Sequence, residues 1–127
     1  MYRTTFALLL AFMLPSPLFA QPANPYDGKW KLTFDGPRTT GLEGTVVVKG
    51  DSGTWNLDLT GQSRNACFKH EAPIAVESAT ADELIFKLNR SKVLAGCEDT
   101  TMRFKKINDK TLKLDARDGR IFTLTRQ

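Results

Sequence analysis

Apolar and polar residues alternate along most of this chain, and this period of two limits the folds that are open to it. Trp30, Leu32 and Phe34 alternate with polar residues near the start, and residues 121–126 repeat the pattern at the end. Because successive side chains of a strand point to opposite faces, the alternation predicts strands with one buried and one solvated face. A helix needs about ten or more residues of helical period with capping residues, and no segment offers them. We therefore predict an all-β protein.

Turn signals divide the alternating segments into short strands. Residues 50–53 and Asp118–Gly119 are turn sequences, and Asp-Gly between alternating runs is among the strongest short hairpin signals. We interpret residues 91–100 as a loop, with one short helical turn as the alternative. The predicted strands are 29–34, 45–49, 55–60, 66–69, 74–77, 84–88, 102–105, 112–115 and 121–126.

Short antiparallel strands that follow one another along the chain have two stable arrangements, a closed barrel and a two-sheet β-sandwich. We predict a small antiparallel up-and-down barrel of about eight strands, because closure removes exposed edges that promote aggregation. The sandwich is the alternative. The interior of such a barrel is just wide enough for its own side chains, so a packed core is favoured over a ligand cavity. The aromatic residues expected to face inward are Trp30, Phe34, Trp55, Phe68, Phe86, Phe104 and Phe122.

Residues 1–20 have the features of a secretory signal peptide. Arg3 supplies the positive charge, residues 6–14 form an apolar run, and Ala20 is the expected cleavage point. The run is far shorter than the roughly 20 apolar residues of a spanning helix, which predicts removal rather than a membrane-spanning anchor. Residues 21–127 would then form one β-barrel domain in the periplasm or outside the cell, because a chain of that size holds one modest core.

The chain has two cysteines, Cys67 and Cys97. In an oxidising compartment an even number of cysteines predicts pairing, so we expect one Cys67–Cys97 disulfide. Their spacing differs from that of a C-x-x-C redox pair, and two thiols alone cannot make a four-ligand zinc site. We therefore assign both cysteines a structural role.

Gly28, Lys29 and Trp30 at the start of the first strand, together with Arg126 at the end of the last, resemble the calycin pattern. In calycins, which include lipocalins and avidins, a first-strand Gly-x-Trp packs against an arginine near the last strand. The second and third lipocalin motifs are not visible here. The resemblance implies an up-and-down barrel closed by its terminal strands, with a mouth that can hold a ligand. A buried tryptophan of any β core is the alternative explanation of Trp30.

Catalytic and metal-binding chemistry finds little support in the residue pattern. His70 is the only histidine, it lies in a charged run, and no G-x-S-x-G element marks a nucleophile. Glu98–Asp99, or Glu77 with Asp82, are carboxylate pairs of the kind that glycoside hydrolases use, but adjacent acids are usually solvent-facing charge. The net charge of +4 is small for a dedicated nucleic-acid binder. We expect no enzyme, no metal, no cofactor and no nucleic-acid partner.

The polar faces of the first strand and of the C-terminal strands are rich in basic residues. Barrel closure would bring these strands together, and a basic face attracts anionic partners. Outward lysines also protect strands against aggregation, which is the alternative explanation. Our leading hypothesis is a non-enzymatic, inhibitor-like binding module for an anionic glycolipid, an acidic polysaccharide or a protein. The second hypothesis is a carrier of a small apolar ligand. The predicted binding face consists of Lys29, Lys31, Arg103, Lys105 and Lys113.

Overall fold

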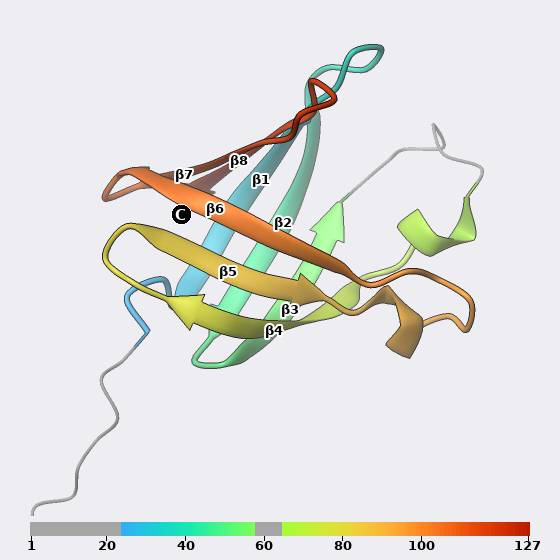
Figure 1. Cartoon of the computed structure of the whole chain (residues 1–127), viewed down its shortest axis with the longest axis horizontal. Helices are drawn as coiled ribbons and strands as arrows, with labels where there is room; N and C mark the ends of the chain where they lie inside the picture. The colour runs from blue at the N-terminus through green and yellow to red at the C-terminus, as the bar shows by residue number, and fades with distance from the viewer. Residues whose placement is uncertain (1–23, 58–64) are drawn as a thin grey trace, which may run out of the picture.

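The computed structural model describes residues 24–57 and 65–127, which form a closed antiparallel barrel of eight strands (Figure 1). Each strand pairs with its neighbour in sequence, and β1 (Gly28–Asp35) closes the barrel by pairing with β8 (Ile121–Arg126). The predicted barrel is therefore confirmed, and the sandwich alternative is wrong. The predicted signal peptide at residues 1–20 lies outside the described residues.

The strands form where the period of two predicts them. Every predicted strand except 66–69 lies within an observed strand over its described residues, and residues 58–60 of the third lie outside them. The loop predicted at 91–100 begins with one short helical turn, the 3₁₀ helix η2 (Arg90–Lys92). The other elements are β2 (Leu42–Lys49), β3 (Ser52–Leu57), η1 (Ala66–Phe68), β4 (Ala72–Ala79), β5 (Glu83–Leu88), β6 (Thr100–Asn108) and β7 (Thr111–Asp115).

The hydrophobic core fills the interior of the barrel with side chains from alternate strand positions. Leu32, Val46, Leu84, Phe104 and Leu124 come from five different strands, and each is 0% exposed. Fully burying a side chain of this kind contributes roughly 1.5–3 kcal/mol relative to leaving it in water. The alternation seen in the sequence is thus converted directly into an inward apolar face and an outward polar one.

One end of the barrel is closed by Trp30 and the residues around it. The indole Nε1 of Trp30 donates a hydrogen bond to the carbonyl of Tyr26 at 2.9 Å, and the guanidinium carbon of Arg126 lies 4.3 Å from the Trp30 ring centroid. Arg126 also donates to the carbonyls of Pro25 and Asp27, each at 2.8 Å. The chain that precedes β1 is therefore held against this end, which we call the closed end.

The two ends of the barrel differ in the length of their connections. At the closed end, short turns at 50–51, 80–82 and 109–110 join consecutive strands. At the opposite end, which we call the mouth, the connections are longer. Because binding residues concentrate on loops that a rigid scaffold positions, the mouth is where a site is expected. Within the described residues, the mouth connections are 36–41, 65–71, 89–99 and 116–120.

Residues 66–69 depart from the prediction, because Ala66–Phe68 form η1 rather than a strand. The Asn65 side chain accepts a hydrogen bond from the Cys67 amide at 3.0 Å, and the Asn65 carbonyl accepts one from the Phe68 amide at 3.1 Å. Local bonds of this kind compete with strand pairing. The prediction that Phe68 faces the core is also wrong, since the turn leaves it 39% exposed.

Candidate ligand site at the barrel mouth

A cavity of about 850 Å³ opens at the mouth of the barrel. Apolar side chains at the inward positions nearest the mouth form much of its wall. Its volume falls within the range of roughly 300–1,000 Å³ that is typical of sites for small ligands. The apolar wall residues, one from each of six strands, are Phe34, Leu42, Leu57, Met102, Leu114 and Phe122.

An aromatic layer lies between this cavity and the core of the closed end. The ring centroids of Phe34 and Phe122 are 4.8 Å apart, and Trp55 lies 5.7 Å from Phe122 and 6.1 Å from Phe86. Phe86 in turn stacks on Phe104 at 5.6 Å. A ligand that enters at the mouth would therefore rest on aromatic rings. The packed core that the sequence predicts fills the closed half of the barrel, while the mouth half holds a cavity.

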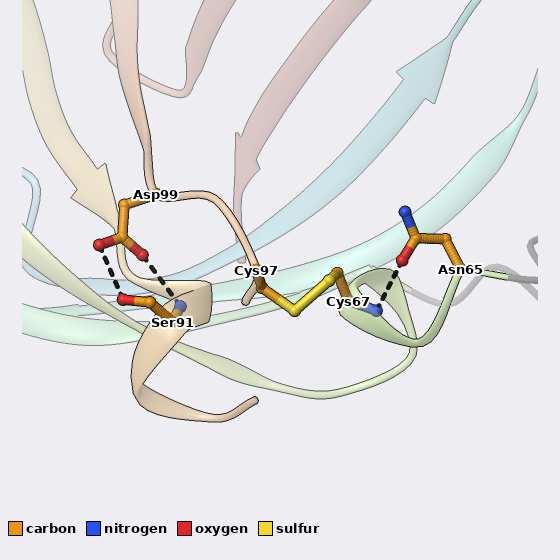
Figure 2. The surroundings of a disulfide bond; sticks show 5 residues. All are labelled: Asn65, Cys67, Ser91, Cys97 and Asp99. Carbon is orange, nitrogen blue, oxygen red and sulfur yellow. Dashed lines mark hydrogen bonds between the residues drawn. A yellow bond between two sulfur atoms is a disulfide. The ribbon is translucent and has the colours of Figure 1, made fainter. Parts of the chain in front are cut away.

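The Cys67–Cys97 disulfide braces the cavity rim and confirms the predicted pairing (Figure 2). It joins the two longest mouth connections, since Cys67 belongs to η1 and Cys97 lies between η2 and β6. Asp99 accepts hydrogen bonds from the amide and the hydroxyl of Ser91, at 2.9 and 2.8 Å. These two bonds lower the pKa of the Asp99 carboxyl and tie η2 to the start of β6.

Arg90 places a positive charge beside the apolar wall. Its side chain is partly buried, and the guanidinium carbon lies 4.7 Å from the centroid of the Phe68 ring. Burial lowers the pKa of Arg90, and the nearby charge of Arg120 lowers it further. The Arg90 carbonyl accepts hydrogen bonds from the amides of Val93 and Leu94, which fixes the backbone that carries the side chain. An arginine stays protonated at neutral pH, so the cavity keeps this charge.

Arg120 brings a second positive charge to the same cavity from the connection between β7 and β8. Its Nε lies 2.7 Å from Oδ2 of Asp118, and its amide donates to Oδ1 of the same residue at 3.2 Å. The Arg120 carbonyl accepts from the Ala116 amide at 2.9 Å. The Asp118–Gly119 turn that the sequence predicts thus also positions a residue of the cavity.

The residues of the predicted basic face lie on the outer surface of β1, β6 and β7. Acidic residues nearby neutralise much of their positive charge. Lys105 of β6 lies directly opposite Lys113 of β7. Among the residues that the structure describes, Lys29 and Lys105 form no ion pair. Exposed pairs contribute little to stability, so their main effect here is to lower the net charge of the face. The ion pairs that involve residues of this face are Lys31–Glu43 at 2.9 Å, Arg103–Glu83 at 3.4 Å and Lys113–Asp115 at 3.6 Å.

The residues that were candidates for catalysis are exposed. His70, Glu77, Asp82 and Glu98 all face solvent, and only Glu98 also lines the cavity. Within 24–57 and 65–127, no group of three histidines, cysteines, aspartates or glutamates is arranged to hold a metal ion. In the same part of the chain, no helix has the length and apolar character needed to cross a membrane.

The two arginines of the cavity were not predicted as site residues from the sequence. Arg120 follows an Asp-Gly turn directly, and that turn was the available signal for its fixed position. No feature of the sequence indicated the position of Arg90. It lies in an irregular connection, and the place of that connection at the mouth depends on barrel closure and on the disulfide.

Fold and site together define the class: an up-and-down β-barrel that is plugged at one end and carries a disulfide-braced, cavity-forming mouth at the other. Comparison with protein-family models, with curated proteins and with solved structures found no significant match to this chain.

Proposed function

We propose that this protein is a non-enzymatic binding module that holds a small apolar ligand in the mouth of its barrel. The observation that carries the proposal is the cavity of about 850 Å³ behind the disulfide-braced rim. Ligand sites are typically concave and mostly apolar, with a small number of polar groups that orient the ligand. The mouth cavity has this composition, because aromatic and aliphatic side chains form much of its wall and two arginines line it.

We place this activity in the periplasm or outside the cell. Residues 1–20 have the pattern of a secretory signal, and disulfides such as Cys67–Cys97 persist in oxidising compartments. We also propose that this barrel is calycin-like. Its support is the strand order together with the packing of Arg126 on Trp30 at 4.3 Å.

The proposal is tested with the neutral apolar fluorophore N-phenyl-1-naphthylamine, whose emission rises in apolar surroundings. We expect saturable binding to residues 21–127 at one site. Leu114→Trp should lower the affinity about tenfold, or about 1.4 kcal/mol, because the larger ring occupies cavity volume that the fluorophore would otherwise fill. The matched control Ile107→Trp adds a similar ring at a position that is 59% exposed and outside the cavity, so it should leave the affinity unchanged.

Both variants should keep the far-ultraviolet spectrum of the unmodified protein, which separates a filled cavity from a lost fold. Absence of saturable binding to the unmodified protein would overturn the proposal. So would an equal loss of affinity in Leu114→Trp and Ile107→Trp, because that result would place the fluorophore elsewhere.

The basic strand face is a second candidate for binding. Lys105 and Lys113 are directly opposed on antiparallel strands, an arrangement in which like charges repel and an anion would relieve the repulsion. This face would take an anionic glycolipid, an acidic polysaccharide or an acidic protein. Its ion pairs with Glu43, Glu83 and Asp115 leave it a smaller net charge than the five basic residues alone would give.

A further inference from the structure

We propose that the ligand of the mouth cavity is an amphipathic anion, a single apolar chain that ends in a carboxylate or a phosphate, with Arg90 and Arg120 binding the anionic group. This inference rests on the proposed function, because it names the class of molecule that the cavity would hold. The chain would lie against the apolar wall and the aromatic layer, and the anionic group would lie toward the rim.

Arg90 carries a charge that no ion pair balances among the described residues. The ion pairs among residues 24–57 and 65–127 involve four other basic residues and Arg120, but none involves Arg90. Its guanidinium instead lies over the Phe68 ring and is partly removed from water. Desolvation disfavours a charged group that lacks an opposite charge, and a bound anion would supply one.

Arg120 lines the same cavity, and its charge makes the charge of Arg90 less favourable. The two guanidinium groups repel each other, which is one cause of the lowered pKa of Arg90. An anion placed between two arginines is attracted by both and screens their repulsion. Two arginines that face one apolar cavity therefore favour an anionic ligand over a neutral one.

Arg120 keeps hydrogen-bond donors that none of the described residues uses. Asp118 engages the Nε of Arg120, and within the described part of the chain the two terminal nitrogens make no hydrogen bond. A guanidinium has five N–H donors, so the terminal groups can still meet carboxylate or phosphate oxygens. Asp118 thus fixes the direction of the side chain without using up its donors.

Glu98 is the acidic residue among the cavity-lining residues, and it limits the charge that the site can balance. Two arginines and one glutamate give the lining residues a net charge of about +1, and Asp118, which pairs with Arg120 at 2.7 Å, lowers the excess further. A ligand with one anionic group therefore comes closest to the charge that the site can balance, whereas a polyanion would meet repulsion from both carboxylates. This charge balance is the reason for proposing a single anionic end group.

The test compares three ligands that share a ten-carbon chain: decanoate, decyl phosphate and 1-decanol. Each displaces N-phenyl-1-naphthylamine from residues 21–127, with the disulfide intact. We expect the two anions to bind at least about tenfold more tightly than the alcohol, a difference that equals about 1.4 kcal/mol. Their order of affinity distinguishes a carboxylate from a phosphate as the preferred group. Added salt should weaken the binding of the two anions and leave the binding of the alcohol unchanged, because salt screens charge attraction.

Arginine variants locate the effect. Arg90→Gln and Arg120→Gln should each lower the affinity for decanoate and decyl phosphate severalfold. The affinity for 1-decanol should stay within about twofold of that of the unmodified protein. Arg117→Gln is the matched control, since Arg117 belongs to the same connection as Arg120, is exposed and does not line the cavity. That variant should bind all three ligands as the unmodified protein does.

The outcomes separate the two proposals. Failure of the fluorophore and of all three ligands to bind would overturn the proposed function and this inference with it. Fluorophore binding with equal affinity for the alcohol and the anions would overturn the inference alone. The inference would also be overturned if the preference for the anions over 1-decanol persisted in both Arg90→Gln and Arg120→Gln. The same holds if Arg117→Gln reduced that preference as much as those two variants do. If an arginine variant loses its fold, the salt dependence of decanoate binding to the unmodified protein tests the inference instead. Binding that does not weaken with added salt would overturn it.

Discussion

Replacing Trp30 with alanine should lower the free energy of unfolding by about 4–5 kcal/mol. Trp30 is 1% exposed, and removing a large buried aromatic side chain costs about 3–5 kcal/mol through lost transfer energy and the cavity left behind. The variant also loses the hydrogen bond to the Tyr26 carbonyl, which is worth about 0.5–1.5 kcal/mol, and the Arg126 cation–π contact, which is worth about 1 kcal/mol. Contributions from contacting groups are not fully additive, so we place the result near the upper end of the first range.

The measurement is urea unfolding of residues 21–127 with the disulfide intact. Trp55 is the other tryptophan of the chain, so it reports the unfolding of Trp30→Ala. Domains of this size have about 5–15 kcal/mol of stability, and the variant could fall below the limit for folding. Trp30→Phe then provides the test, because it keeps most of the ring and should cost about 1–2 kcal/mol. A loss below about 1 kcal/mol in Trp30→Ala would refute the role of Trp30 at the closed end.

Three further perturbations test the mouth and the basic face. Cys97→Ser should lower the free energy of unfolding by about 2–5 kcal/mol, and two titratable thiols in unreduced, denatured protein would contradict the pairing on which this rests. Because Ser91 lowers the pKa of Asp99, the carboxylate stabilises the fold above its ordinary pKa of about 3.9 and loses that effect as the pH falls. Asp99→Asn should therefore lower the melting temperature at pH 7, and the difference from the unmodified protein should shrink as the pH falls below about 4; a difference that does not change with pH would refute this. Lys31→Glu with Lys105→Glu should keep the fold and abolish any salt-sensitive binding of acidic polysaccharide, whereas unchanged binding would remove the basic face as a site.

The barrel was predictable because the information for it is local and repeated. Alternation at residues such as Trp30 and Leu32 sets which face of a strand is buried, and Asp118–Gly119 marks a reversal between neighbouring strands. When each strand pairs with the next, these local signals almost determine the sheet, and closure between β1 and β8 follows from the tendency of sheets to avoid open edges.

The cavity was not predictable by the same reasoning. Its wall residues, such as Leu57 and Leu114, have the same alternating pattern as fully buried residues of the closed end. What distinguishes them is that they stand at strand ends nearest the long connections, a position defined only after all eight strands are in register. The placement of Arg90 depends likewise on closure and on the Cys67–Cys97 bond, neither of which is visible in its neighbours in sequence.

The plugged end and the cavity-bearing mouth have a common physical origin in the connections. At the closed end, side chains satisfy the polar backbone of the short turns, since Asn24 donates to the Gly50 carbonyl at 2.7 Å and Asp27 accepts from the Gly50 amide at 2.6 Å. Trp30 and its neighbours fill the interior there. Long connections generally run over the surface, because a buried one would carry backbone polar groups that lack partners, so they contribute less packing than a core does. The Cys67–Cys97 bond links two of these connections covalently at the rim, and it also reduces the entropy of the unfolded chain. The stability that this bond adds offsets part of the packing energy that a barrel with an open mouth lacks compared with a solid core.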